Sequence, residues 1–489
     1  MGTEIDRTEF EEADYIAFRR RLQQNLEQLE QLLASPGFGA GPGSIGSELE
    51  MYLVDASGYP LYANQELQEQ ANDPQLTLEL NRYNLEFNLS PQALHARPFA
   101  STESEILEKL AMLRELAQTR GGQVVLTGIL PTLRESDFGP HCITDSKRFH
   151  ALVAQLIKRR GHAFSVDING AEPLKMAMAD ITLEGANTSF QVHYRVRPER
   201  FADTFNALQL VTPLVLAMAG NSPTLFGHCL WQETRIPLFK QSIDTRIRDR
   251  YNWNEPARVN YGHGWVRRHP LELFAEAVRL YPPLLPVCAS AEDHQQQPPL
   301  LSELRLHQST VWAWNRPVYD PLGGGHLRIE MRTLPAGPTP VDMVANAAFL
   351  IGLAEGLRPR INDLLPALPF HLAEYNFYRA AQNGLDARLV WPELDQNGFR
   401  EQRAATVVGE LLPLAYRGLA DIGIESSEAE RYLGVIAQRL ARRQTGANWQ
   451  VGRLQQLRKK FPAEEALQRM LQDFINLSVS NQPVAEWPL

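Results

Sequence analysis

A pair of glutamates in an otherwise apolar strand constrains this chain more than any other feature. Residues 44–54 read Ser-Ile-Gly-Ser-Glu-Leu-Glu-Met-Tyr-Leu-Val. As a strand, this segment places Leu49 and Met51 on one face and Glu48 and Glu50 on the other. Two carboxylates on one face repel each other, and burying either of them is expensive. A bound cation is the usual remedy, so the question is whether other segments supply further ligands.

A second segment, residues 76–89, also carries acids between apolar residues. Glu79 lies between two leucines, and Glu86 lies between Leu85 and Phe87. Their odd separation would put the two carboxylates on opposite faces of one straight strand. We therefore expect a bend or bulge at residues 81–84, where asparagines favour a turn, if both acids face one site.

Two later segments show the same alternation. Residues 188–196 place Gln191 and His193 on one face, and residues 326–333 place Glu330 and Arg332 on one face. Each feature alone has a structural explanation, because polar residues commonly line the solvated face of a sheet. Repetition favours a functional site, since glutamate is depleted in strands. Carboxylate-rich sites suit Mg²⁺ or Mn²⁺, and neighbouring arginines suggest ATP phosphates.

The strands and intervening helices predict an α+β fold. The simplest architecture is a curved, largely antiparallel sheet that packs its apolar face on helices and presents the acids on its concave face. A long helix is expected at 8–34, and Thr102 and Glu105 have the spacing of a capping box at the start of another. We expect a single catalytic domain over residues 1–489, with a core at about 45–355 and a mostly helical part at about 356–489.

Composition narrows the function classes. The chain has 489 residues, of which 44% are hydrophobic, and a formal net charge of -9. This balance argues against a nucleic-acid or anionic membrane partner. The three cysteines, Cys142, Cys229 and Cys288, show no C-x-x-C spacing and indicate a reducing compartment. The first residues are acidic, without the features of a signal peptide, and no long apolar run is present, so we expect a cytoplasmic protein.

Taken in order, these motifs resemble the glutamate–cysteine ligase and carboxylate–amine ligase family, which has the glutamine-synthetase-like catalytic fold. The resemblance covers roughly residues 45–355, and the ordered set is more specific than any one motif. The matching segments are Gly46-Ser-Glu-Leu-Glu50, Glu79 with Leu85-Glu-Phe87, Gln191-Val-His-Tyr194, Ala219-Gly-Asn-Ser-Pro223 followed by Glu233-Thr-Arg235, and Arg328-Ile-Glu-Met-Arg332.

The resemblance implies roles for individual residues in a funnel-shaped active site. A metal that bridges the ATP phosphates would be held by Glu48, His193 and Glu330, and a metal nearer the acyl substrate by Glu50, Glu79 and Glu86. Arg332 and Glu330 would be the catalytic residues, with Arg332 beside the transferred phosphate and Gln191 also at ATP. Substrate binding would fall to Arg235, Arg246 and Asn221.

The resemblance further implies an ATP- and Mg²⁺-dependent ligase, with Mn²⁺ as a possible substitute. It would join the γ-carboxyl of glutamate to an amine through an acyl phosphate, and cysteine as acceptor would give γ-glutamylcysteine for glutathione biosynthesis. The alternatives are a ligase for another amine, a phosphotransferase such as a guanidino kinase, and a regulatory protein without chemistry. The sequence leaves open the acceptor amine, the oligomeric state, feedback regulation, and the roles of the cysteines and the C-terminal helical part.

Overall fold

A curled antiparallel sheet forms the centre of the computed structural model, which describes residues 5–246, 255–392 and 399–489. Its strand order is β13-β14-β8-β1-β3-β2, and each neighbouring pair is antiparallel. Two short strands also pair with β1. The bounds are β1 Ser44–Asp55, β2 Leu76–Leu78, β3 Asn84–Asn88, β4 Gln92–Ala93, β5 Gly122–Val125, β8 Phe190–Val196, β13 Asn315–Asp320 and β14 His326–Met331.

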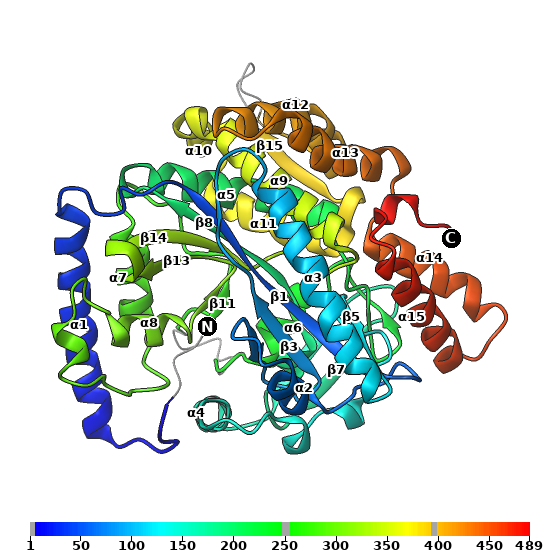
Figure 1. The fold of residues 1–489 in the computed structure, drawn as a ribbon, viewed down its shortest axis with the longest axis horizontal. Coiled ribbons are helices and arrows are strands. Elements are labelled where there is room, and N and C mark those ends of the chain that lie inside the picture. The colour runs from blue at the N-terminus through cyan, green and yellow to red at the C-terminus, as the bar shows by residue number, and fades with distance from the viewer. Residues whose placement is uncertain (1–4, 247–254, 393–398) are drawn as a thin grey trace.

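Helices cover the apolar face of this sheet (Figure 1). Leu49, Met51 and Leu53 of β1 are buried in the same hydrophobic cluster as residues of these helices, as the alternation predicts. Of these helices, α3 Pro98–Thr119 and α5 Pro198–Ala219 contact the sheet, and α9 Pro340–Leu357 packs on both of them. Further helices pack on α5 and α9: α11 Phe370–Asn383, α12 Ala404–Asp421 and α13 Ser426–Arg442. The predicted α+β fold with a curved antiparallel sheet backed by helices is therefore confirmed.

Two of the helical segments are long and apolar enough to cross a membrane by composition alone. They are α5 and the continuous run Pro340–Ala367, which joins α9 to α10 (Ile361–Ala367). The most apolar windows of these segments are 89% and 94% buried inside the protein. Such burial is expected of core helices, which are apolar on all sides.

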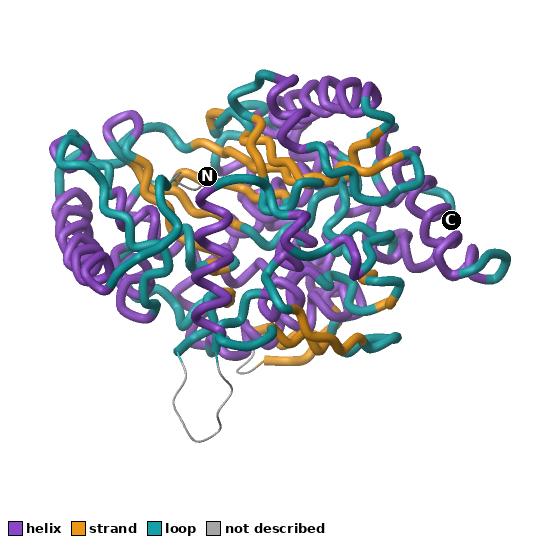
Figure 2. The backbone as a smooth tube through the Cα atoms, turned by 90° about the horizontal axis from the view of Figure 1, so that it is seen from below, coloured by secondary structure: helices purple, strands orange, loops and turns teal. Residues whose placement is uncertain are grey.

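Smaller groups of helices flank the sheet on either side (Figures 1 and 2). Beside the edge strand β13, helix α1 (Glu12–Ala34) packs on α7 (Leu271–Leu280) and α8 (Ser302–Gln308). On the other side, α14 and α15 pack on each other around a second hydrophobic cluster. The remaining elements are α2 Asn64–Ala71, α4 Lys147–Arg160, α6 Arg235–Ser242, α14 Gly446–Arg458, α15 Ala463–Val479 and the strands β6 Phe164–Ile168, β7 Leu174–Met178, β9 Thr224–Leu225, β10 His228–Cys229, β11 Val259–Asn260, β12 Trp312–Ala313, β15 Arg388–Pro392 and β16 Phe399–Arg403.

The local predictions have mixed outcomes. The bend at 81–84 is confirmed, because β2 ends at Leu78 and β3 begins at Asn84. The capping box is wrong: α3 begins at Pro98, and the Thr102 hydroxyl donates to the carbonyl of Pro98 inside the first turns of the helix. The part beyond residue 356 is mostly helical but also contains the β15–β16 hairpin. The single-domain organisation stays a prediction.

Candidate active site

Cross-strand register brings acidic residues of three strands and a histidine of a fourth into one patch. Glu330 of β14 lies directly opposite His193 of β8, and Glu50 of β1 lies directly opposite Glu86 of β3. Directly opposed side chains in an antiparallel pair have Cβ atoms about 5 Å apart. Glu79 joins them from the bend that follows β2. Residues far apart in the sequence therefore meet on the face of the sheet that is turned away from the helices.

The first cluster consists of Glu48, His193 and Glu330, whose potential ligand atoms all lie within 4.8 Å of one another. His193 Nε2 lies 3.0 Å from Glu48 Oε1. The three side chains are buried, and β14, β8 and β1 hold them from three adjacent strands. The structure thus brings together the residues that the family resemblance groups around the nucleotide phosphates.

Arginines neutralise the charge of this first cluster. Arg316 Nε donates to Glu330 Oε2 and an Arg332 terminal nitrogen donates to Glu330 Oε1, both at 2.6 Å. Burial alone would raise the pKa of Glu330, but the Arg316 and Arg332 guanidinium groups hold it well below its usual range. Glu330 is therefore ionised in the folded protein.

The second cluster consists of Glu50, Glu79 and Glu86, whose potential ligand atoms also lie within 4.8 Å of one another. Burial and the neighbouring charge of Glu86 raise the pKa of Glu79 well above its usual range. Burial, together with the charge of Glu48, raises the pKa of Glu86 to about 8. These shifts show negative charge without enough compensation from the protein, which a divalent cation would supply.

Arg332 and Gln191 connect the two clusters. An Arg332 terminal nitrogen donates to Gln191 Oε1 as well as to Glu330, and Gln191 Nε2 donates to Glu50 Oε1 at 2.8 Å. The amide of Ser189 also donates to Glu50 Oε2 at 2.7 Å. The Nε of Arg332 is buried without a hydrogen-bond partner among the described residues, so this arginine retains a donor for a ligand.

The three residues expected to bind substrate have different settings. Arg235 is buried, and it donates to Glu233 Oε1 at 2.9 Å and to the Thr333 carbonyl at 2.6 Å. Burial raises the pKa of Glu50, and the charge of Arg235 acts in the opposite direction. Its positive charge therefore acts on the second cluster. Arg246 forms an ion pair with Asp244 at 2.8 Å, and within the described residues no hydrogen bond or ion pair joins it to either cluster. It lines a separate hollow.

Asn221 is fully buried and its side-chain amide already has protein partners. Its Nδ2 donates to the Ala336 carbonyl at 2.7 Å, and its Oδ1 accepts from Gln450 Nε2 at 2.8 Å. The backbone amide of Asn221 donates to Glu233 Oε2, and the other oxygen of this carboxylate, Oε1, accepts from Arg235 Nε. The side chain thus ties helix α14 to the loop that supports Arg235, and a direct role in substrate binding stays a prediction.

Sequence reasoning missed two charged residues of the site. Arg316 lies on the edge strand β13, which contains Pro317 and was not expected as a strand, although proline is acceptable at a sheet edge. Glu184 lies on a 3₁₀ turn, Thr182–Ala186, where no alternation marks it. Burial and the charge of Glu50 raise the pKa of Glu184 to about 7, so its carboxyl adds to the acidic end of the site.

The donor sets fit divalent cations to different degrees. The second cluster offers only carboxylate oxygens, which Mg²⁺ and Mn²⁺ prefer, and its charge is poorly compensated. The first cluster offers two carboxylates and one imidazole, but arginines already compensate Glu330. The residues present therefore fit a metal at Glu50, Glu79 and Glu86 most directly, and a second metal at Glu48, His193 and Glu330 would compete with existing ion pairs.

Part of this chain matches known proteins in sequence. Residues 44–261 match the sequence model of glutamate-cysteine ligase family 2. A Frankia alni protein, provisionally named glutamate–cysteine ligase 2-1, is 25% identical over 322 residues, which cover 64% of this chain and 66% of that relative. The region that the family model matches includes the first strand, His193 and Arg235, but it ends before Glu330.

Solved structures extend the comparison to the fold. A bifunctional glutathione synthetase from Pasteurella multocida has a TM-score of 0.51 at 11% identity, over 94% of this chain and 55% of that chain. A glutamate–cysteine ligase from Francisella tularensis in complex with AMP has a TM-score of 0.49 at 12% identity, over 92% of this chain and 95% of that chain. The sequence match and the shared fold support the resemblance: over residues 44–261 this chain is similar to the glutamate–cysteine ligases, and its fold is that of carboxylate–amine ligases.

Proposed function

We propose that this protein uses ATP and Mg²⁺ to join the γ-carboxyl group of glutamate to an amine, with cysteine as the leading candidate acceptor. The observation that carries the proposal is the pair of acidic clusters, one buried and one half-buried, connected through Arg332 and Gln191. This arrangement suits a reaction in which one anion, a carboxylate, must attack another anion, a phosphate. The proposal also accounts for the match to the glutamate–cysteine ligase family.

The first step would form an acyl phosphate. A γ-carboxylate oxygen attacks the terminal phosphorus of ATP, the bond to the bridging oxygen breaks, and ADP leaves. Mg²⁺ held by Glu50, Glu79 and Glu86, and by Glu48, His193 and Glu330, would neutralise the carboxylate and the phosphates. The guanidinium of Arg332, oriented by Glu330 and Gln191, would stabilise the charge on the transferring phosphoryl group.

The second step would form the amide. The amine attacks the acyl carbon, inorganic phosphate leaves with the former carboxylate oxygen, and the amine loses a proton. Arg235 would bind the α-carboxylate of the donor amino acid, because it is a buried cation, besides Arg332, whose charge acts on Glu50. Water must be kept from the acyl phosphate during this step, since hydrolysis would yield only ADP, phosphate and free glutamate.

The decisive experiment measures phosphate release from ATP with glutamate and a panel of amino acids and amines, with the products identified by mass spectrometry. Phosphate release that depends on both glutamate and cysteine, with γ-glutamylcysteine as product, supports the proposal. Hydroxylamine in place of the amine should trap the acyl phosphate as the γ-glutamyl hydroxamate. A stable phosphorylated product without free phosphate would instead indicate a phosphotransferase. Glu79→Gln provides the matched inactive control.

A cytoplasmic location and a place in glutathione biosynthesis belong to the same proposal. Both follow from cysteine as the acceptor and from the thiols Cys142, Cys229 and Cys288, all of which are free. If another amine is the productive acceptor, the ligase chemistry stands and the place in metabolism changes.

A further inference from the structure

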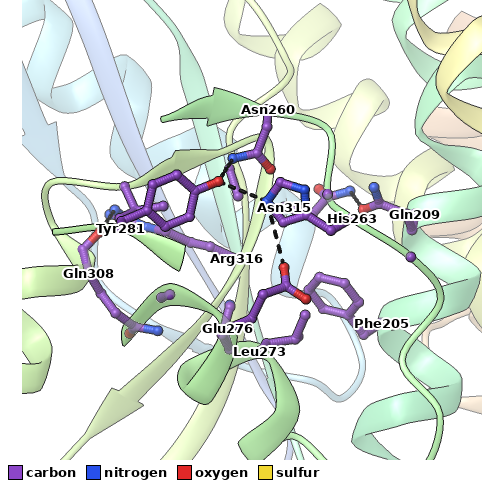
Figure 3. A pocket seen from close by; sticks show the side chains of 16 residues that line it. Phe205, Gln209, Asn260, His263, Leu273, Glu276, Tyr281, Gln308, Asn315 and Arg316 are labelled. Carbon is purple, nitrogen blue, oxygen red and sulfur yellow. Dashed lines mark hydrogen bonds and ion pairs between the residues drawn. The ribbon is translucent and has the colours of Figure 1, made fainter. Parts of the chain in front are cut away.

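A small cavity lies beside the edge strand β13, outside both acidic clusters (Figure 3). Its volume is ≈ 50 Å³, which is room for one or two small polar groups. The polar residues of its wall include Asn260, His263, Glu276, Tyr281, Asn315 and Arg316. They come from β11, the loop that follows it, α7, and β13.

Two asparagine oxygens in this wall have no hydrogen-bond partner among the described residues. They are Asn260 Oδ1 and Asn315 Oδ1, and the two residues are only 7% and 3% exposed. A buried amide oxygen without a donor costs free energy, so such atoms normally bind a ligand or an ordered water. The cavity therefore offers two acceptors that the protein itself leaves unused.

The orientation of both amides is fixed by their other atoms. Asn260 Nδ2 faces the Ala257 carbonyl at 3.1 Å and the Arg258 carbonyl at 3.3 Å, and a carbonyl can only accept. Asn315 Nδ2 donates to Gln209 Oε1 at 2.8 Å. Gln209 is itself fixed, because its Nε2 donates to the Tyr261 carbonyl. Exchanging oxygen and nitrogen at either asparagine would set donors against donors or acceptors against acceptors.

The third acceptor of the cavity is the carboxyl of Glu276. His263 Nε2 lies 3.9 Å from this carboxyl, and no lysine or arginine of the described residues forms an ion pair with it. Burial lowers the pKa of His263, and its Nε2 hydrogen-bonds Tyr281 Oη at 2.8 Å, so this histidine is neutral near pH 7. Burial also raises the pKa of Glu276 to about 7, as expected of a carboxylate that lacks a cation. Figure 3 shows Glu276, His263, Tyr281 and Asn260 linked in one chain of contacts.

A larger hollow of ≈ 860 Å³ adjoins this cavity and shares His263, Gly264, Leu273 and Glu276 with it. Its wall has apolar residues, among them Trp265, Val266, Leu271, Ala275 and Leu280, beside charged residues such as Glu30, Arg267 and Arg279. The inner cavity thus presents oxygens and a carboxylate, and part of the outer hollow presents apolar surface. A molecule with an ammonium group and a short apolar body would match both parts.

We propose that this cavity binds an ammonium group, whose N–H donors reach Asn260 Oδ1, Asn315 Oδ1 and the Glu276 carboxylate. The ammonium is either a free ion or the head group of a small primary amine whose body lies in the outer hollow. The cavity lies outside the two acidic clusters, and the inference does not depend on the ligase proposal. Arg316 connects the two regions, because it lines the cavity and its Nε donates to Glu330.

Isothermal titration calorimetry of the full chain with ammonium chloride and with n-propylammonium chloride tests this inference. Both salts should show saturable binding that tetramethylammonium, which has no N–H donor, does not show. Tighter binding of n-propylammonium identifies an amine with an apolar body as the ligand class, and equal affinities identify the free ion. Absence of saturable binding by both cations, or equal binding of tetramethylammonium, overturns the proposal and leaves a water-filled cavity.

Two variants with a matched control make the test specific. Glu276→Gln removes the negative charge and should weaken binding roughly tenfold or more, since hydrogen bonds to charged groups are strong. Gly264 lines both spaces, so Gly264→Val should narrow the passage between them. The fold can accept this change, because a Cβ at Gly264 would meet no atom within 4 Å. The control, Glu115→Gln, removes an exposed carboxylate on α3 and should bind as the unsubstituted protein does. Unchanged binding in both cavity variants, with unchanged thermal unfolding, overturns the assignment.

Discussion

Arg328 Nε donates a hydrogen bond to His193 Nδ1 at 3.0 Å. A guanidinium group can only donate, so Nδ1 is the unprotonated nitrogen and the proton of the neutral imidazole lies on Nε2, which faces Glu48 Oε1. A metal bound through Nε2 needs a lone pair there, and the proton would have to move to Nδ1. Arg328 therefore opposes the tautomer in which His193 could be a metal ligand at the first cluster.

This relationship predicts the effect of two substitutions on Mn²⁺ affinity. Arg328→Met and Arg328→Gln both remove a positive charge, and both should tighten Mn²⁺ binding. Only the glutamine carbonyl can accept a hydrogen bond from the N–H of His193 Nδ1, so Arg328→Gln should bind Mn²⁺ about fivefold more tightly than Arg328→Met, as one hydrogen bond predicts. Electron paramagnetic resonance titration of Mn²⁺ measures the difference. Equal affinities in the two variants would show that His193 is not a ligand.

Glu330 accepts one ion pair on each carboxylate oxygen, from Arg316 and from Arg332. Glu330→Gln should therefore lower the free energy of unfolding by about 3 kcal/mol, because it deprives two largely buried guanidinium groups of the carboxylate that they share. The additional substitution Arg316→Met should restore part of this loss. Urea unfolding of both single variants and the double variant measures the coupling energy between the two residues. If the losses of unfolding free energy in the single variants simply add in the double variant, Glu330 and Arg316 do not stabilise each other.

Arg332 should affect catalysis more than nucleotide binding. It contacts Glu330 and Gln191 between the two clusters, and its buried Nε is free for a ligand. In Arg332→Lys we expect kcat to fall on the order of 10²-fold while the KM for ATP stays within about threefold, since the planar fork is lost and the charge is kept. Steady-state kinetics of ADP formation provide both constants. A rise in KM alone would assign Arg332 to ground-state binding.

The second cluster predicts a conflict between stability and activity. Burial and Glu86 raise the pKa of Glu79, so the metal-free cluster is destabilised as pH rises and its carboxyls ionise. Glu79→Gln should therefore stabilise the metal-free protein at pH 8 by about 1 kcal/mol and abolish ADP formation. It should also reduce the rise in Tm that Mg²⁺ causes in the unsubstituted protein. Destabilisation by Glu79→Gln in the presence of EDTA would show that the cluster is already neutral without metal.

The parts of the fold and site that the sequence revealed are those with strong alternation. Glu48, Glu50, His193 and Glu330 lie on strands whose opposite faces are apolar, so their common face followed from a period of two. The position of Glu79 on the same face followed from the bend expected at residues 81–84, between the end of β2 and the start of β3. Register between strands does not follow from one sequence, and the family resemblance supplied the grouping into two clusters.

The missed features depend on tertiary contacts. Thr102 and Glu105 have the spacing of a helix start, but Glu428 Oε1 accepts from the backbone amide of Phe99 at 2.6 Å and caps a helix that begins earlier. A partner 329 residues away cannot be read from local sequence. Arg316 and Glu184 were missed for a similar reason, because an edge strand with proline and a 3₁₀ turn have no periodic pattern.

His307 predicts how stability changes in acid, far from the acidic clusters. Burial lowers its pKa to about 4, its Nε2 donates to the Ala277 carbonyl at 2.9 Å, and the residue is 1% exposed. An unfolded histidine has a pKa of about 6.5, so between pH 6.5 and 4 the unfolded chain binds the extra proton. This contribution to stability is complete above pH 6.5 and decreases as pH falls, by about 3 kcal/mol at pH 4.

Replacing His307 with a neutral residue should remove this dependence. His307→Gln keeps an N–H donor for the Ala277 carbonyl, and its free energy of unfolding should change less between pH 6.5 and 4 than that of the unsubstituted protein. The matched control is His162→Gln, because His162 is exposed, and its profile should be unchanged. Urea unfolding at a series of pH values measures all three profiles. If the free energy of unfolding of His307→Gln falls between pH 6.5 and 4 as steeply as that of the unsubstituted protein, protonation of other groups causes the acid sensitivity. His307 would then be charged or solvated in the folded state.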